Sequence, residues 1–294
     1  MCNSDRYPFD LDRPEDYALW RERKLDGYPT RLADLMVEIR DPRSPTDVEV
    51  EAVLTCCRRA NMVIYASRRG NDPDKEIPRL LGARLGLIRP DRNLGADEDA
   101  VSLLTVRSDA RRHGYIPYSN RPIAWHTDGY YNAPDRRICG MLLHCVQPAA
   151  VGGENDLLDH EIAYLLLRDR NPEFIRALMH PRAMTIPANV ADGEVLRPER
   201  SGPVFSVHPD GHLHMRYTDR TRSIHWREDP LTTKAVSCLK DILHERTAWH
   251  FSAGLEAGWG LVTNNTLHTR ARFEDGECPR LLYRARYYDR IRGT

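Results

Sequence analysis

Short apolar segments, rich in β-branched and aromatic side chains, recur along most of the chain and are separated by turn-forming residues. This pattern is typical of strands in a β-sandwich or barrel. The predicted strands cover residues 62–65, 101–106, 138–146, 183–187, 204–207, 212–217, 261–264 and 281–288. Pro209 and Gly211 separate two of these segments and favour a tight turn, so we expect a hairpin there.

Three segments show the spacing of amphipathic helices instead. Thr46 is a suitable N-cap for a helix within residues 45–62, and Asp159 is a suitable N-cap for residues 159–169. A third helix is predicted over residues 233–246, because its apolar side chains fall on one helical face: Ala235, Cys238, Leu239, Ile242 and Leu243. These helices are expected to pack on the sheet.

The predicted elements are unevenly distributed along the chain. Residues 1–95 are mostly helical in this prediction, whereas residues 96–290 carry most of the strands, with helical insertions. No internal repeat, low-complexity tract or linker-like segment divides the sequence. We therefore expect residues 1–294 to form a single domain that is mainly β with flanking helices.

Composition and charge narrow the functional class. With 41% hydrophobic and 29% charged residues the chain is typical of a globular protein, and its 43 Lys and Arg balance its 43 Asp and Glu. This balance gives no long-range attraction to nucleic acid or to an anionic membrane. The uncharged run over residues 138–153 is too short to span a bilayer, and the first residues show no signal-peptide pattern. We expect a cytoplasmic protein that binds neither nucleic acid nor membrane, and a homo-oligomer remains open.

Candidate chemistry lies where two apolar segments end. Residues 123–126 predict a short strand that brings His126 and Asp128, two positions apart, to one face of an extended backbone. His268 ends a second apolar segment, residues 260–268. Two histidines and one carboxylate are the ligand set of the facial triad that binds Fe(II) and leaves other coordination positions open.

Arginines occupy one face of the last predicted strand. Arg280, Arg284 and Arg286 are separated by even numbers of residues, so their side chains share a side of the strand. A planar guanidinium binds a carboxylate in a bidentate manner that lysine cannot reproduce. A co-substrate bearing a carboxylate is therefore the expected partner. Arg270 and Arg272 are expected in a solvated loop.

The order of these motifs resembles the TauD/TfdA family of Fe(II)- and 2-oxoglutarate-dependent dioxygenases. The resemblance extends from roughly residue 100 to residue 290 and rests on four motifs: His126-Thr-Asp128, Gly152-Gly-Glu-Asn155, Asn264-Asn-Thr-Leu-His268 and Arg280-x-x-x-Arg284. It implies a double-stranded β-helix (jelly-roll) core, with Fe(II) held by His126, Asp128 and His268. It also implies that Arg280 binds the distal carboxylate of 2-oxoglutarate.

The same resemblance implies an oxidoreductase that uses O2 and 2-oxoglutarate to oxidise, in the first place to hydroxylate, an unactivated C–H bond, with release of succinate and CO2. Asn155 replaces the hydroxyl residue that often follows the two glycines, so its amide is implied to contact 2-oxoglutarate. In taurine-dioxygenase-like members the position of Arg284 helps to hold an anionic substrate group. We expect a small polar or anionic substrate, amino-acid-like, a carboxylate or a sulfonate, in a pocket lined by Tyr130 and Tyr131.

Alternatives remain open at this point. The same fold could bind a metal and a carboxylate as a sensor, or could hold zinc for a hydrolysis that does not need the arginine. His208, His212 and His214 form a second histidine cluster that could bind a metal. Arg284 could pair with an internal carboxylate such as Glu154.

Overall fold

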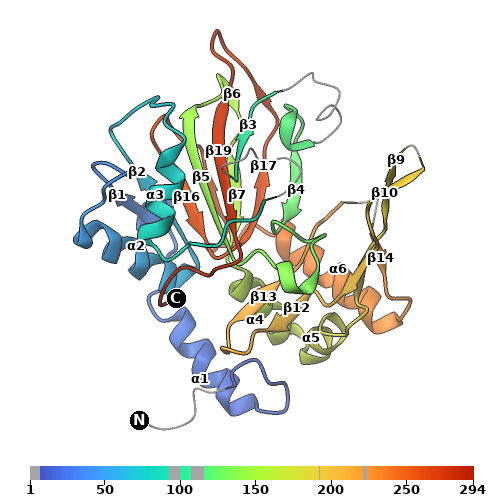
Figure 1. Ribbon diagram of the computed structural model, residues 1–294. Helices are drawn as coiled ribbons and strands as arrows, with labels where there is room; N and C mark the ends of the chain where they lie inside the picture. Colours follow the sequence, from blue (N-terminus) through green and yellow to red (C-terminus); the bar gives the residue numbers. More distant parts are fainter. Residues whose placement is uncertain (1–6, 93–99, 107–115, 192, 221–223) are drawn as a thin grey trace.

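The computed structural model describes residues 7–92, 100–106, 116–191, 193–220 and 224–294, and it has a mixed α/β architecture (Figure 1). The α-helices are α1 Pro14–Leu25, α2 Asp47–Ala60, α3 Glu76–Arg84, α4 His160–Arg170, α5 Pro172–Leu178 and α6 Pro230–His244. Short 3-10 helices cover Leu32–Leu35, Ile116–Tyr118 and Pro134–Arg136. Within the described ranges, no helix combines the length and the apolar character needed to cross a membrane.

Six strands form the largest sheet, in the order β1-β2-β16-β5-β19-β3. Their bounds are β1 Met36–Glu38, β2 Met62–Ala66, β16 Gly260–Thr263, β5 Gly140–Gln147, β19 Leu281–Tyr287 and β3 Val101–Leu104. β1 and β2 are parallel, and the other neighbours are antiparallel. The first third of the chain therefore contributes strands to this sheet as well as helices.

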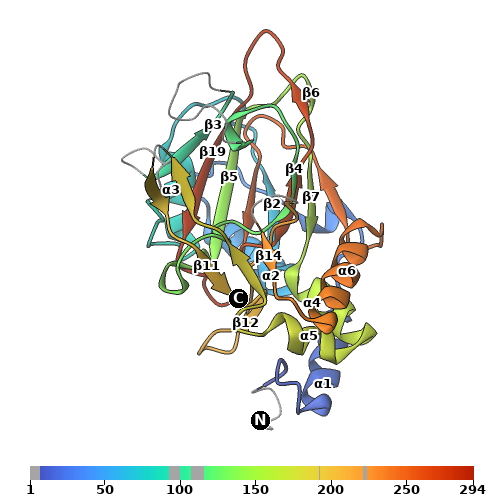
Figure 2. The same cartoon turned by 90° about the vertical axis from the view of Figure 1, so that its right-hand side faces the viewer.

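A second sheet, in the order β15-β7-β17-β4, lies beside the first in both views (Figures 1 and 2). Its strands are β15 Phe251–Ala253, β7 Asn155–Leu158, β17 Leu267–Arg270 and β4 Ile123–His126. The largest hydrophobic cluster joins the two sheets, with Ile64 of β2, Leu143 of β5 and Leu157 of β7 among its members. Polar side chains that lie between these sheets are consequently shielded from water.

The outer face of the large sheet is covered by α2 and α3, at the left of Figure 1. Side chains alternate across a strand, so Tyr65 of β2 and Leu142 of β5 point away from the inner cluster. They join a second cluster with Val53 of α2 and Leu81 of α3. The central strands are therefore buried on both faces, which explains why their sequences read as continuous apolar runs.

The helix predictions are confirmed, with one boundary corrected. Thr46 caps α2 and forms a capping box, since its side chain accepts from the Glu49 N–H and the Glu49 carboxylate accepts from the Thr46 N–H. Helix α6 begins at Pro230, three residues before the predicted start. Asp229 accepts the Thr232 N–H at 2.9 Å, and proline suits the first helical turn.

The eight predicted strands are present as β2, β3, β5, β8 Met184–Ile186, β12 Phe205–Val207, β13 Leu213–Met215, β16 and β19. β12 and β13 pair as the expected hairpin, with Gly211 at a left-handed φ of 90°. Further short strands escaped the pattern: β1, β6 Val151–Gly152, β7, β9 Asn189–Ala191, β10 Glu194–Arg197, β11 Arg200–Gly202, β14 His225–Trp226, β15, β17 and β18 Phe273–Glu274.

A buried ion cluster connects the amino-terminal helices to α4. Lys24 Nζ lies 2.7 Å from Asp159 Oδ2 and 2.6 Å from Glu161 Oε2, and it donates to the Arg59 carbonyl at 2.9 Å. The second Asp159 oxygen accepts from Asn61 Nδ2 at 3.0 Å. Burial by itself would raise the pKa of Glu161, but the Lys24 ammonium outweighs it and lowers that pKa. One ammonium therefore compensates two buried carboxylates.

Replacement of Lys24 by methionine should lower the free energy of unfolding by about 3–5 kcal/mol, because it leaves buried carboxylates without their cation. Urea denaturation followed by circular dichroism would measure the loss. The matched control is Arg170→Met, which removes a more exposed partner of Glu245 and should change stability little. Equal losses of stability in the two variants would contradict the role of Lys24 in compensating the buried carboxylates.

The contribution of this cluster should depend on pH in one direction. The folded-state pKa of Glu161 lies below its usual value, so the stabilisation is fully present above the unfolded pKa of about 4.3. It is lost as the pH falls through the folded-state pKa. The stability difference between the wild type and Lys24→Met should therefore shrink in acid.

Candidate active site

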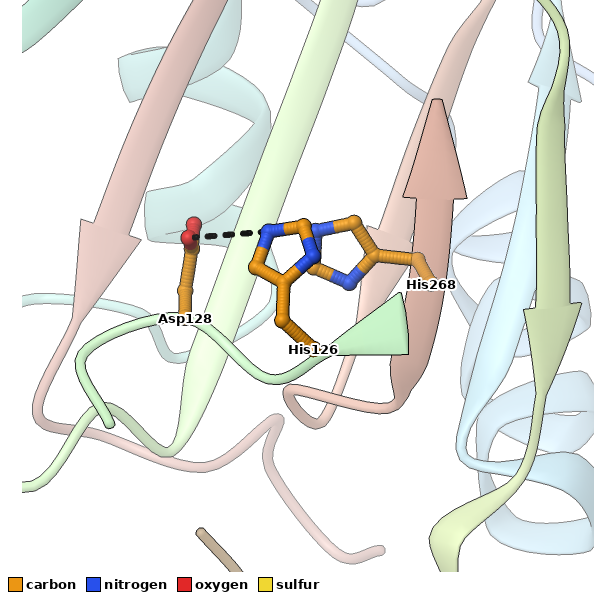
Figure 3. A group of neighbouring side chains, drawn as sticks. All are labelled: His126, Asp128 and His268. Atoms are coloured by element: carbon orange, nitrogen blue, oxygen red, sulfur yellow. Dashed lines mark ion pairs between the residues drawn. The ribbon is translucent and has the colours of Figure 1, made fainter. Parts of the chain in front are cut away.

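Three potential metal ligands converge from two neighbouring strands of the second sheet. His126 ends β4, Asp128 follows two residues later, and His268 is the second residue of the antiparallel strand β17. The strand register places His126 directly opposite His268. The ligand atoms of the three side chains lie within 4.8 Å of one another, and Figure 3 shows them pointing toward a common centre.

Both imidazoles are held in the tautomer that suits metal binding. The Nδ1 of His126 lies 2.9 Å from the Ala124 carbonyl, and the Nδ1 of His268 lies 3.0 Å from the Thr266 carbonyl. A carbonyl only accepts, so each Nδ1 carries the proton and each Nε2 keeps its lone pair. Burial, with the neighbouring His268 as the next cause, lowers the pKa of His126 to about 3, so this ring is neutral near pH 7.

The Asp128 carboxylate is ionised although it is buried. Burial by itself would raise its pKa, but Arg284 and Arg286 outweigh this effect and hold the pKa well below its usual range. Arg284 Nη1 lies 3.3 Å from Asp128 Oδ1, and Arg286 Nη1 lies 4.0 Å from it. The other oxygen, Oδ2, is buried and has no hydrogen-bond partner among the described residues. An unsatisfied anionic oxygen is what a cation would complete.

The donor set fits Fe(II). Two neutral imidazoles and one carboxylate, all three nearly buried, reproduce the facial triad and leave open positions for other ligands. In the described part of the chain, no other group of three or more histidine, cysteine or acidic side chains comes as close together. His208, His212 and His214 lie at the β12–β13 hairpin, where they line a separate surface cleft. The structure therefore gives no support to a second metal site in this cluster.

Arg280 presents a buried guanidinium without an acidic partner. The residue is 4% exposed, its guanidinium carbon lies 4.9 Å from the centre of the Phe273 ring, and its backbone N–H donates to Asp275 at 2.8 Å. No carboxylate among the described residues forms an ion pair with its side chain. Burial lowers the pKa of Arg280, because the charged guanidinium is less well solvated there than in water. A buried cation of this kind requires an anion.

The Gly152-Gly-Glu-Asn155 motif makes room for this guanidinium. Gly152 and Gly153 adopt left-handed φ values of 76° and 83°, which side chains rarely adopt. A Cβ at Gly153 would lie 3.2 Å from Arg280 Nε. Asn155 is buried in β7, where its Nδ2 donates to the Thr269 carbonyl at 2.6 Å. One of its amide hydrogens is thus used to join β7 to β17.

The prediction of a solvated loop after His268 is wrong for Arg270. Arg270 lies in β17, is 5% exposed, and donates to carbonyls of four residues: Ile116, Pro117, Ser119 and Arg121. Burial, together with the neighbouring Arg280 and Arg284, lowers the pKa of Arg270 to about 9. Arg270 follows His268 by two residues and therefore shares its strand face, and this spacing could have predicted that Arg270 lies near the site. The acid beside Arg284 is Asp128 rather than Glu154.

Tyr130 and Tyr131 follow Asp128 in the loop after β4. Their rings meet edge to face with centroids 5.1 Å apart. The Tyr130 hydroxyl accepts from Arg220 at 3.1 Å, and the Tyr131 hydroxyl accepts from Arg286 at 3.0 Å. Both rings are therefore held close to the metal-binding loop by hydrogen bonds at their polar ends.

Comparison with known proteins identifies a family. A model described as "Taurine catabolism dioxygenase TauD, TfdA family" matches residues 69–286. A uridine-5'-phosphate dioxygenase from a Streptomyces species is 30% identical over 221 residues, which are 68% of this chain and 77% of that protein. A uridine-5'-phosphate dioxygenase from an Amycolatopsis species is 29% identical over 176 residues, which are 58% of this chain and 62% of that protein.

Solved structures share the fold. The non-heme iron oxygenase OrfP, in complex with Fe, succinate and (3S)-hydroxy-L-Arg, has a TM-score of 0.62 and 15% identity, covering 83% of this chain and 81% of that one. A taurine dioxygenase from Burkholderia xenovorans has a TM-score of 0.57 and 19% identity, covering 88% of this chain and 89% of that one. At such identities the likeness concerns the arrangement of the elements.

Replacement of Asp128 or His268 by alanine should abolish Fe(II) binding at micromolar metal, because each change removes one of the three ligands that the described residues bring together. Anaerobic Fe(II) titration of the metal-free protein would measure this. His212→Ala, in the hairpin cluster, is the control and should bind Fe(II) like the wild type. Loss of binding in the control alone would place the metal at the hairpin.

The family assignment and the geometry agree. The matched region contains β4 and β17, which carry the two histidines, and also Asp128, two residues after β4, and Arg280, which directly precedes β19. The chain belongs to the TauD/TfdA family of Fe(II)- and 2-oxoglutarate-dependent dioxygenases.

Proposed function

We propose that this protein oxidises, in the first place hydroxylates, an unactivated C–H bond of a small anionic metabolite. One atom of O2 enters the substrate and the other enters 2-oxoglutarate, which leaves as succinate and CO2. The observation that carries the proposal is the buried guanidinium of Arg280, which has no acidic partner among the described residues and directly precedes β19, the strand whose Arg284 contacts Asp128. A metal hydrolase or a structural metal site would have no use for it.

We assign the metal to His126 Nε2, His268 Nε2 and the Asp128 carboxylate. When bound, Fe(II) together with 2-oxoglutarate supplies the activation of O2. The protein holds the imidazoles in one tautomer through the Ala124 and Thr266 carbonyls, and burial excludes water from the donors. The ligands are thus oriented before the metal arrives.

We assign the distal carboxylate of 2-oxoglutarate to Arg280. A bidentate contact would compensate the buried guanidinium, while the Phe273 ring and the backbone of Gly153 exclude water from it. Asn155 is our proposed amide contact for the same co-substrate. Its buried position in β7 supports this role, although one amide hydrogen is already donated to the Thr269 carbonyl.

We propose that Arg284, Tyr130 and Tyr131 bind the substrate. Arg284 Nε is buried without a hydrogen-bond partner among the described residues, so this guanidinium retains capacity for an anion. Relatives that share about three tenths of their residues are uridine-5'-phosphate dioxygenases. A phosphate-bearing substrate, with uridine-5'-phosphate as the first candidate, therefore joins the amino-acid-like, carboxylate and sulfonate compounds expected from the sequence.

We also propose that the core is a double-stranded β-helix formed by a single domain. Two features support this. The six-stranded and four-stranded sheets share one hydrophobic cluster. β2, from the amino-terminal third, pairs with β16 inside the larger sheet. An amino-terminal region that supplies an internal strand is unsuited to fold apart from the rest.

The proposed reaction is tested by succinate release from 2-oxoglutarate under O2. We expect release to rise at least tenfold over the uncoupled background with uridine-5'-phosphate, and much less with uridine, because the phosphate supplies the anion. Glutamate and taurine complete the panel for the carboxylate and sulfonate classes. Absence of succinate with every compound, in protein that binds Fe(II) and 2-oxoglutarate, would contradict the proposed substrate class.

Arg280→Gln should raise the KM for 2-oxoglutarate about 100-fold, because truncating a buried charge contact costs about 2–5 kcal/mol. Gly153→Ala should act in the same direction, since the added Cβ strains the left-handed backbone and presses on Arg280. Steady-state kinetics would measure both. The control is Arg272→Gln, an exposed change in the same region, and an equal effect there would contradict the assignment.

A further inference from the structure

Asn265 connects the two segments that carry the metal ligands. It lies in the turn between β16 and β17, three residues before His268. Its Oδ1 accepts the Asp128 N–H at 2.7 Å, and its Nδ2 donates to the Asp128 carbonyl at 2.9 Å. The same Nδ2 donates to the Ile138 carbonyl at 2.7 Å. All the hydrogen-bonding groups of this side-chain amide therefore bind backbone atoms.

The backbone of Asn265 is adapted to this contact. Its φ of 56° is left-handed, a conformation in which asparagine is enriched among non-glycine residues. Its own N–H donates to Thr263 Oγ1 at 3.0 Å, and the residue is 3% exposed. The conformation of the turn thus places the buried Asn265 amide against the backbone of Asp128.

Asp128 needs such support more than the histidines do. His126 and His268 are fixed opposite each other by the strand register. Asp128 lies two residues beyond the end of β4; the Thr127 N–H still donates to the Tyr217 carbonyl at 3.0 Å, but among the described residues Asp128 itself belongs to no strand pair. The paired contacts of its N–H and C=O with one side-chain amide replace the missing strand hydrogen bonds.

We propose that Asn265 is a positioning residue that fixes the Asp128 backbone relative to His268 before metal binds, and thereby sets the affinity for Fe(II). This inference rests on the proposed role of the triad as the Fe(II) site. Outer partners of metal ligands typically change metal affinity 10- to 100-fold when removed. Asn265 is not itself a ligand, but its amide fixes the backbone from which the Asp128 side chain extends.

The neighbouring Asn264 provides a matched control. It is equally buried, at 3% exposed, and its amide binds residues other than Asp128. Its Nδ2 donates to Asn61 Oδ1 at 3.0 Å, and its Oδ1 accepts the Ile291 N–H at 3.1 Å. A change at Asn264 disturbs the same turn without touching Asp128.

The test is Asn265→Gly, because glycine accepts the left-handed φ and removes only the side chain. Anaerobic titration should show Fe(II) affinity roughly 10- to 100-fold weaker than in the wild type. In the metal-free protein, hydrogen exchange of the Asp128 amide should accelerate, while that of Val262 in β16 should not change. Asn264→Ala should lower the melting temperature and leave the Kd for Fe(II) within about twofold of the wild type, since it removes no ligand partner.

A second variant keeps the test decisive if Asn265→Gly does not fold. Asn265→Asp retains the acceptor for the Asp128 N–H but faces two carbonyls with an anion, so Fe(II) affinity should again fall. Wild-type affinity in either folded variant would overturn the inference, as would equal weakening in Asn264→Ala. Failure of the wild type itself to bind Fe(II) would instead overturn the proposed function, so the two failures are distinguishable.

Discussion

The antiparallel pairing of β4 with β17 is the interaction on which the site depends. It brings His126 opposite His268 from distant parts of the chain, with ring centroids 4.2 Å apart. Adjacent strands lie about 4.8 Å apart, which is the separation that lets two imidazoles share one ion. The third ligand, Asp128, lies past the end of β4 and is held by side chains instead. The geometry of the centre is thus partly a property of the sheet and partly one of the turns at its end.

Compensation of buried positive charge organises the rest of the site. Arg270 is neutralised in effect by backbone carbonyls, Arg286 by Asp91, and Arg284 by the metal-binding carboxylate. Arg280 has no such partner among the described residues, which is why we propose it as the contact for an anionic ligand. Compensation within the protein thus distinguishes Arg270 and Arg286, which help to build the site, from Arg280 and Arg284, which we propose to bind ligands.

The amino-terminal third is connected to the same centre by polar contacts as well as by packing. The buried cluster of Lys24 and Asp159 reaches Asn61, and Asn61 binds Asn264 in the turn before His268. Asn61 and Asn264 are both buried, so this contact lies in the protein interior. A region without any metal ligand is therefore joined by hydrogen bonds to the turn that precedes one.

The sequence by itself determined the features that depend on neighbours in the chain. The apolar run of β5, the alternation of arginines along β19, the cap at Thr46 and the spacing of His126 and Asp128 are all local, and each was predicted. Tertiary structure alone decided the carbonyl partners of Arg270, the pairing of Arg284 with Asp128 and the pairing of very short strands such as β6 with β18. Their hydrogen bonds and ion pairs come from partners far away in the chain, and so no local pattern of apolar and polar residues could specify them.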